Sequence, residues 1–185
     1  MTPLLRFEQV ACRRGGRLLF EGLDLMLGAG EALHLIGPNG SGKSSLIRLA
    51  AGLLRPESGR VEREAAALAD DSSALDRELP LGRALAFWSG TRPRDDAIQA
   101  LGLAHLADVP VRLLSSGQLK RATLARVAMS GAPLWLLDEP LNGLDADGIA
   151  RLDALVAAHR SAGGAVLAAS HGKLGGAWSS LSLGA

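Results

Sequence analysis

The stretch "ALHLIGPNGSGKSSLIRLAAG", residues 32–52, decides the fold of this chain. Its first residues, 32–36, are almost all apolar and are typical of a short buried strand. A loop with three glycines follows, and then apolar residues recur at helical spacing as far as Gly52, which predicts a helix over 43–52. Such a unit places the loop at the carboxyl end of its strand, where open parallel sheets bind ligands.

The loop over 37–44 follows the pattern Gly-x-x-x-x-Gly-Lys-Ser. Its glycines let the backbone turn N–H groups toward phosphate oxygens, and the N-terminus of the next helix favours an anion. In this pattern Lys43 reaches the β- and γ-phosphates, while the hydroxyl of Ser44 binds Mg²⁺. A plain glycine-rich turn is the alternative, and the flanking strand and helix argue against it. We therefore expect a bound nucleotide to contact Gly37, Pro38, Asn39, Gly40, Ser41, Gly42, Lys43, Ser44 and Ser45.

Strand-like and helical stretches alternate on both sides of this unit. Upstream, two stretches alternate well enough to form an antiparallel layer, at 4–11 and 19–27. Downstream, helices are expected over 81–88, 94–102, 118–130 and 147–161, and strands over 133–140, 165–170 and 179–184. Residues 64–80 indicate no element clearly. The alternation after residue 32 predicts an α/β domain with a mainly parallel sheet.

Composition excludes several classes of protein. The 185 residues suit a single domain, and a net charge of +1 gives no electrostatic reason to bind nucleic acid. No apolar run approaches the roughly 18–20 residues that span a bilayer, and the first ten residues do not resemble a signal peptide. The single cysteine, Cys12, cannot form an internal disulfide and suits a reducing compartment. We expect a cytoplasmic domain that binds no nucleic acid.

An apolar strand over 134–137 ends in two acids, Asp138 and Glu139. Its carboxyl end should lie beside the phosphate loop, so Asp138 is expected to bind Mg²⁺ directly or through water. Glu139 points elsewhere and is suited to polarise an attacking water. Two solvated acids in a turn are the alternative, and their position after a phosphate loop favours catalysis.

His171 follows the strand expected over 165–170, at the same edge of the sheet. An imidazole there could hydrogen-bond a γ-phosphate. The remaining histidines have no such context, and we interpret them as structural or exposed: His34, His105 and His159.

The stretch "LSSGQ", residues 114–118, predicts a second anion-binding site. Ser115 and the backbone N–H groups of Ser116 and Gly117 would lie at the start of a helix, whose dipole favours negative charge. The chain already has one phosphate loop, so a second γ-phosphate site is redundant within one copy. The redundancy disappears if this loop serves the nucleotide of another copy.

Five motifs together resemble the ATP-binding subunit of an ABC transporter over essentially the whole chain: GPNGSGKS, LSSGQ, LLDEP, LNGLD and SH. The resemblance implies an α/β P-loop NTPase of the ABC type, in a single domain over 1–185. Its mainly parallel core would carry an N-terminal antiparallel β layer and an inserted helical subdomain over about 72–130.

The resemblance also implies an ATP-dependent, head-to-tail homodimer, in which ATP lies between the phosphate loop of one copy and the signature loop of the other. Catalytic roles are implied for Lys43, Glu139 and His171, and Mg²⁺ ligation for Ser44 and Asp138. Residues 141–145 match the D-loop. Further nucleotide contacts are implied for Ser115, Ser116, Gly117, Gln118 and Asp145. Ser116 stands where a glycine is more usual.

Separate membrane-spanning subunits would complete such a transporter, with this chain peripheral at the cytoplasmic face of the inner membrane. The stretches "LRPESG", "ELPLGRALAFW" and "APLWLLDEPLNGLD" resemble the haem-exporter branch of the family, which acts in cytochrome c biogenesis and has haem-handling membrane partners. Trp88 and Trp135 stand where that branch often has aromatics, and both could equally be core residues. Alternatives are an exporter of another small substrate, a nucleotide-sensing module, an ATPase acting on nucleic acid or the ribosome, and a small-molecule kinase.

Two departures from the family pattern affect the site. The glutamine usual between the phosphate and signature loops is missing, since no glutamine lies between Gly37 and Gln99. One of three residues would occupy its place: Asp70, Asp71 or Ser72. An aromatic that stacks on adenine is also missing, and the guanidinium of Arg13 or Arg14 could replace it.

Overall fold

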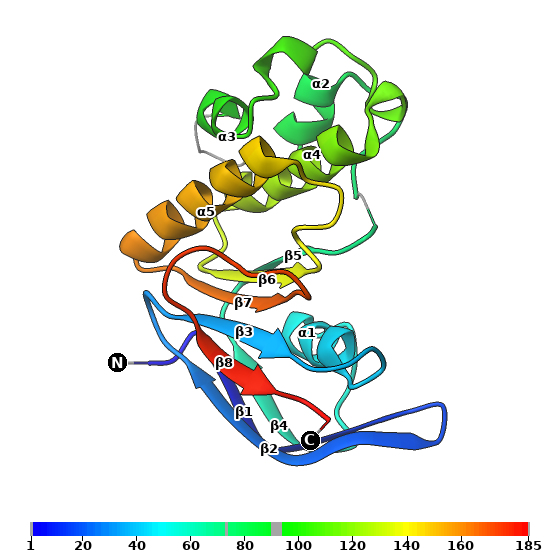
Figure 1. Ribbon diagram of the computed structural model, residues 1–185, viewed down its shortest axis with the longest axis vertical. Coiled ribbons are helices and arrows are strands. Elements are labelled where there is room, and N and C mark those ends of the chain that lie inside the picture. Colours follow the sequence, from blue (N-terminus) through cyan, green and yellow to red (C-terminus); the bar gives the residue numbers. More distant parts are fainter. Residues whose placement is uncertain (1, 73, 90–93, 185) are drawn as a thin grey trace.

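The computed structural model describes residues 2–72, 74–89 and 94–184 (Figure 1). Within these residues an antiparallel sheet has the order β2-β1-β4, formed by β1 (Leu5–Arg14), β2 (Arg17–Leu27) and β4 (Ser58–Arg63). The predicted antiparallel layer is therefore confirmed. Its third strand, β4, was not predicted, because "SGRVER" is mostly polar and exposed and shows no clear alternation.

A parallel sheet lies beside this layer, with the strand order β5-β6-β7-β3-β8 among the described residues. Its strands are β3 (Ala32–Ile36), β5 (Ala66–Ala69), β6 (Leu134–Asp138), β7 (Ala165–Ala169) and β8 (Ser179–Ser182). The central strands are covered on both faces, which explains why their sequences are almost continuously apolar. The mainly parallel core and the final edge strand are thus confirmed.

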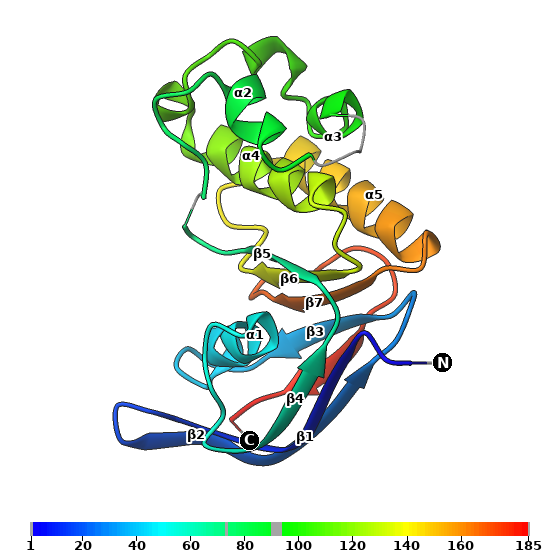
Figure 2. The same cartoon turned by 180° about the vertical axis from the view of Figure 1, so that it is seen from behind.

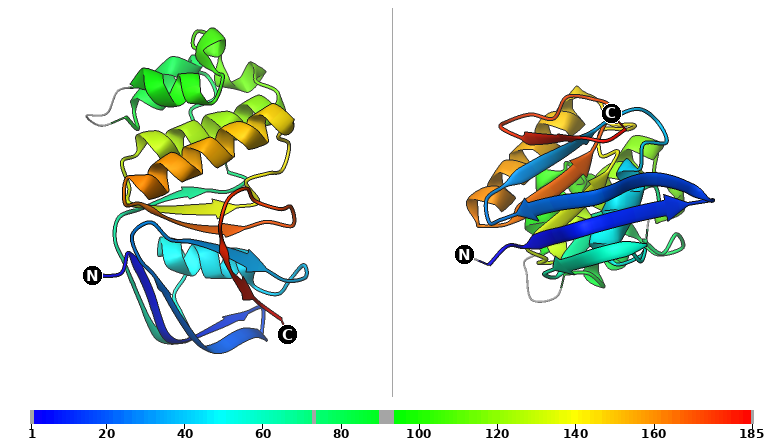
Figure 3. Two further views of the ribbon diagram at one scale, coloured as in Figure 1. Left: turned by 60° about the vertical axis from the view of Figure 1, so that its left-hand side comes forward. Right: turned by 90° about the horizontal axis from the view of Figure 1, so that it is seen from below.

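Helices cover both faces of the parallel sheet (Figures 1 and 2). Helix α1 (Lys43–Ala51) lies between the two sheets, and α4 (Ser116–Met129) and α5 (Ala146–Ser161) cover the opposite face. Beyond α4 lie α2 (Leu81–Ala86), α3 (Arg94–Ala100) and two short 3-10 turns, Ala104–Leu106 and Val111–Leu113. Figure 3 shows this succession of layers from the side and the antiparallel sheet from below.

Successive residues of β6 point into two different hydrophobic cores. Leu134 and Leu136 pack toward α1 and the antiparallel sheet, whereas Trp135 and Leu137 pack beneath α4 and α5. Trp135 is 4% exposed and stacks on His159, with 3.8 Å between ring centroids. This burial supports the interpretation of Trp135 as a core residue.

The predicted helices are present, but several end earlier than expected. The helix over 81–88 ends at Ala86 and the one over 94–102 ends at Ala100, differences of the size that fraying helix ends produce. The stretch 64–80, which indicated no element, contains β5 and a long irregular segment. Strand β5 is short and rich in alanine, so neither β-branched residues nor alternation marked it.

Candidate functional site

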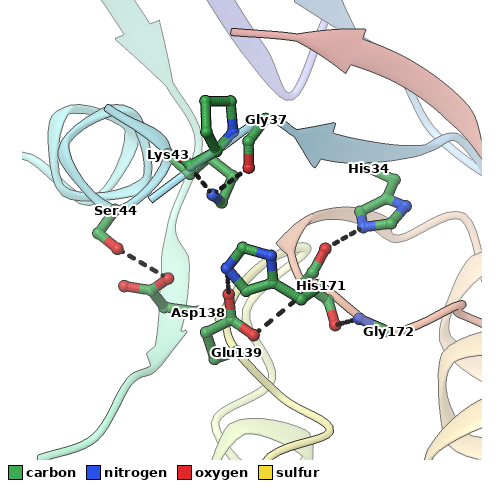
Figure 4. A network of polar contacts seen from close by, with 10 residues as sticks. His34, Gly37, Lys43, Ser44, Asp138, Glu139, His171 and Gly172 are labelled. Atoms are coloured by element: carbon green, nitrogen blue, oxygen red, sulfur yellow. Dashed lines mark hydrogen bonds and ion pairs between the residues drawn. The ribbon is translucent and has the colours of Figure 1, made fainter. Parts of the chain in front are cut away.

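The phosphate loop connects β3 to α1 at the carboxyl edge of the parallel sheet (Figure 4). Gly37 has a φ of 145°, and a Cβ there would lie 2.3 Å from the carbonyl oxygen of Leu183, so only glycine fits. The Lys43 ammonium donates to the carbonyl oxygens of Gly37, at 2.7 Å, and of Pro38, at 3.0 Å. An ammonium has three donors, so one remains for a phosphate oxygen.

Ser44 and Asp138 meet as the pattern predicted. The Ser44 hydroxyl donates to Asp138 Oδ1 at 3.1 Å, which joins the first turn of α1 to the end of β6. This pair of hard oxygen ligands beside a phosphate loop fits Mg²⁺. Burial raises the pKa of Asp138 above its ordinary value, and the neighbouring Glu139 adds to the rise, while the hydrogen bond from Ser44 opposes it.

Glu139 has an unusual backbone for a residue with a side chain, with a φ of 48°. Its N–H donates to the Ala169 carbonyl at 2.8 Å, which holds the turn against the end of β7. Its carboxylate faces His171: Oε2 accepts the His171 backbone N–H at 3.4 Å, and Oε1 lies 3.5 Å from His171 Nε2 (Figure 4). The structure therefore brings together the two residues that were expected to act on the water and the γ-phosphate.

A hollow of about 560 Å³ lies at this edge of the sheet. Its lining includes Lys43, Ser44, Glu139 and His171, together with Asn39, Gly40, Gly42, Ser45, Asn142, Leu19 and Arg14.

Of the two arginines left open by the sequence, only Arg14 lines this hollow. Arg13 is held elsewhere, because its Nε donates to both carboxylate oxygens of Glu57, at 3.0 and 2.9 Å, and its Nη1 donates to the Gly16 carbonyl.

The signature loop begins α4 with a complete capping box. The Ser115 hydroxyl accepts the Gln118 N–H at 3.3 Å, and the Gln118 side chain accepts the Ser115 N–H at 2.8 Å. The helix starts at Ser116, two residues before the predicted start. Gly117 lies so close to the D-loop that a Cβ would be 2.7 Å from the Gly143 carbonyl oxygen. Ser115 and Gln118 thus have a structural role besides any contact with nucleotide.

A second hollow, of about 300 Å³, lies over this loop and is lined by Ser115, Ser116, Gly117, Gln118, Arg121, Gly143, Leu144 and Asp145. It shares no lining residue with the phosphate-loop hollow. Consecutive D-loop residues separate the two, since Asn142 lines the first and Gly143 the second. Asp145 also caps α5 by accepting the Gly148 N–H at 2.8 Å.

Residues 70–72, where the missing glutamine is expected, form a tight acidic turn. The register of β5 with β6 pairs Ala69 with Leu137, so Asp70 follows beside Asp138. Asp70 Oδ1 accepts the Ser72 N–H at 3.0 Å and the Ser72 hydroxyl at 2.6 Å. The Asp71 side chain is 94% exposed and lies 3.9 Å from the Lys120 ammonium.

Lys120 is a residue that sequence reasoning missed. Its side chain is 9% exposed, and burial lowers the pKa of its ammonium, while Asp71 and then Asp138 oppose that shift. Within the basic run of α4 nothing in the sequence distinguishes Lys120 from Arg121, so the sequence contains no signal for it.

A more apolar cavity of about 570 Å³ lies at the opposite edge of the sheet, near the starts of β6 and β7, and its lining includes Met129, Pro133, Trp135 and Leu155. It contains none of the predicted site residues. The polar groups converge at the carboxyl edge, as the rule for open parallel sheets requires.

The sequence pattern of the ABC transporter family matches residues 20–142 of this chain. The chain belongs to the ABC transporter family. It is an ATP-binding subunit, and the family resemblance inferred from its motifs is confirmed. None of its described helices is both long and apolar enough to cross a bilayer.

Known relatives and structures agree with this assignment. The chain is 58% identical over 177 residues to the cytochrome c biogenesis ATP-binding export protein CcmA of Sphingopyxis alaskensis, covering 92% of this chain and 91% of the relative. It is 46% identical over 182 residues to CcmA of Rhodospirillum rubrum, covering 89% and 78%.

Among solved structures, an ATP-binding subunit of an ABC transporter superposes with a TM-score of 0.83 at 22% identity, covering 91% of this chain and 79% of that one. The cbiO1 protein of Clostridium perfringens, described as part of the transporter complex cbiONQ, has a TM-score of 0.76 at 25% identity, covering 92% and 79%. The expected ABC-type fold is confirmed.

Replacing Asp138 by Asn should stabilise the nucleotide-free protein. A raised carboxyl pKa means that the ionised form is disfavoured in the fold. The penalty therefore grows as pH rises through the unfolded pKa, and it is complete above the folded pKa. Differential scanning fluorimetry at pH 7.5 should show a gain of about 2–4 °C in Tm, corresponding to ~1 kcal/mol for a chain of this size. The gain should vanish at acidic pH, and stabilisation by Mg²⁺–ATP should be lost. Asp108→Asn, at an exposed site, is the control; an equal gain there would contradict the burial argument.

Proposed function

We propose that this chain hydrolyses ATP as a homodimer in which each nucleotide lies between the phosphate loop of one copy and the signature loop of the other. The observation that carries the proposal is the pair of separate hollows. One is lined by Lys43, Ser44 and Glu139, and the other by the N-terminus of a capped helix, Arg121 and part of the D-loop. A helix N-terminus with free N–H groups suits a γ-phosphate, and a second copy supplies one.

The chain's own residues have distinct tasks in this reaction. Lys43 and the loop N–H groups bind the β- and γ-phosphates, and Ser44 and Asp138 would hold Mg²⁺, which neutralises charge on the phosphate oxygens when bound. Glu139 orients a water for attack on the γ-phosphorus and takes its proton as the bond to the β-phosphate oxygen breaks. His171, whose Nε2 lies 3.5 Å from the Glu139 carboxylate, would donate to the γ-phosphate.

We further propose that hydrolysis powers haem export, or release of a loaded haem carrier, in cytochrome c maturation. The names of the relatives support this assignment. The chain would dock on membrane-spanning subunits and haem-handling membrane proteins at the cytoplasmic face of the inner membrane. This proposal is tested by co-purifying the tagged chain with its membrane partners and measuring its rate of ATP turnover with and without haem. A rate that does not change when haem is added favours another small substrate.

The missing glutamine favours one competing function, a nucleotide-sensing module that binds ATP without turning it over. The acidic turn at Asp70 offers charge where the amide is usual, and an ATPase rate measured with the membrane partner present separates the two functions.

Glu139→Gln should trap the ATP-bound dimer. The amide keeps the shape of the side chain but cannot accept the proton, so hydrolysis should fall about 100-fold or more. Light scattering after gel filtration should show a dimer that persists in Mg²⁺–ATP, whereas the wild type returns to monomer. Unchanged turnover in this variant would remove Glu139 from the role of base.

Changes in the signature loop should separate hydrolysis from binding. Gly117→Ala, alone or with Ser115→Ala, should lower turnover by about tenfold or more, because a shift of the loop against the D-loop misplaces its donors. Nucleotide affinity of the monomer, measured by calorimetry with ADP, which lacks the γ-phosphate that the signature loop would bind, should stay within about twofold. Ser116→Gly, which restores the usual glycine, is the control and should remain active. A parallel loss of affinity would mean that the loop acts on its own copy's nucleotide.

Arg14→Ala should weaken ATP binding, whereas Arg13→Ala should not. A guanidinium stacked on adenine is worth ~0.5–1 kcal/mol at an exposed site, so the dissociation constant should rise about two- to fivefold. The ion pair of Arg13 with Glu57 is exposed, and losing it should cost little. Arg14→Tyr, which supplies the usual aromatic, should restore affinity. A larger loss of ATP affinity in Arg13→Ala than in Arg14→Ala would assign the contact with adenine to Arg13.

A further inference from the structure

His34 is the one histidine of the phosphate-loop strand, and it contacts the segment that carries His171. It lies in β3, half-buried, and its Nε2 is 2.9 Å from the carbonyl oxygen of Ser170 (Figure 4). A carbonyl oxygen can only accept, so the proton must be on Nε2, in the neutral ring as well as in the imidazolium.

The Ser170 carbonyl is a group that needs a partner. The parallel pairing of β3 with β7 ends at Leu35 and Ala169, so Ser170 is the first residue beyond the ladder. Ser170 is only 3% exposed, and a buried carbonyl without a hydrogen bond is costly. The side chain of His34 thus supplies a donor where the strand ladder stops supplying one.

Ser170 in turn fixes the residue that follows it. Its hydroxyl accepts the Gly172 N–H at 3.1 Å, so the backbone on both sides of His171 is tied to Ser170. His171 itself contacts Glu139 through its backbone N–H and its ring. A continuous chain of contacts therefore runs from His34 to the catalytic carboxylate.

The remainder of this segment is anchored at its far end, on α5. The Gly175 N–H donates to Asp153 at 3.1 Å, and Arg160 Nη1 donates to the Ala177 carbonyl at 2.7 Å. Trp178 then closes the segment back on His34, with the two rings edge to face at 6.3 Å. The segment 170–175 is thus bound at its first residue, Ser170, by the side chain of His34 in β3.

We propose that His34 is a positioning residue for ATP hydrolysis: by donating to the Ser170 carbonyl it holds His171 in reach of Glu139 and the γ-phosphate. The inference rests on the proposed function of Glu139 and His171. Because His34 stands three residues before the phosphate loop, the same contact couples the strand that carries the nucleotide to the segment that detects its γ-phosphate.

A pair of substitutions tests this role. His34→Leu keeps bulk in the strand but removes the donor, and kcat should fall about tenfold while KM and ATP affinity stay unchanged, because a fraction of an ångström at a catalytic group costs that order of rate. His34→Gln places an amide N–H at comparable reach and should restore most of kcat. His105→Leu, at an exposed turn of the helical layer, is the matched control.

Imidazole nitrogen NMR of the nucleotide-free protein gives a readout that does not need hydrolysis. The chain has four histidines, so long-range ¹H–¹⁵N spectra can be assigned with single substitutions. His34 should show the Nε2–H tautomer, and His34→Leu, but not His34→Gln, should shift the ring signals of His171. An Nδ1–H tautomer in the wild type would overturn the proposal even if His34→Leu failed to fold.

The kinetic outcomes distinguish failure of this inference from failure of the proposed function. Equal turnover by the wild type and Glu139→Gln would overturn the catalytic assignment itself. If Glu139 is confirmed as base, three results would overturn the role of His34. These are an unchanged kcat in His34→Leu, an equal loss of kcat in His34→Leu and His34→Gln, and a change in His34→Leu that is confined to KM.

Discussion

The hydrogen-bonded register between four parallel strands is the constraint on which the site depends. β5, β6, β7 and β3 lie side by side and end at one edge, so residues from distant parts of the chain meet there: Asp70, Asp138, Ser170 and Gly37. A slip of one residue in any strand would turn its side chains to the other face. One apolar core lies on each face of the sheet, and each alternating set of side chains fits only its own core, which prevents such a slip.

Negatively charged side chains gather at this edge of the sheet even without a bound nucleotide. Asp70, Asp71, Asp138 and Glu139 lie within the electrostatic reach of one buried cation, Lys120. Burial disfavours charge on both Asp138 and Lys120, and each is partly compensated by its neighbours. A divalent ion held by Ser44 and Asp138 would relieve the repulsion among the acids, so the fold and the metal support the same arrangement of charges.

The sequence was informative where a residue type is forced by backbone geometry or by chemistry. The phosphate loop, the acids after β6 and the signature loop follow rules that need no knowledge of neighbours, and the structure brings Ser44 to Asp138 and His171 to Glu139. Features that depend on contacts between distant parts of the chain could not be predicted from the sequence. Strand β4 forms by pairing with the edge of β1. Arg13 and Arg14 are neighbours in sequence, yet Arg13 binds Glu57 whereas Arg14 lines the phosphate-loop hollow. His34 and Lys120 likewise acquire significance from partners far away in sequence.

The succession of Asn142 and Gly143 has a consequence for how two nucleotide sites would communicate. Asn142 faces the hollow of its own phosphate loop, and the next residue faces the hollow of the signature loop. In the proposed pair, a single peptide unit of each copy would then touch both ATP molecules. Any rotation of that unit that improves the fit of one nucleotide alters the fit of the other, and by thermodynamic reciprocity the effect is equal in both directions. Cooperativity between the sites would need no long path through the protein, because it would be built into one step of the backbone.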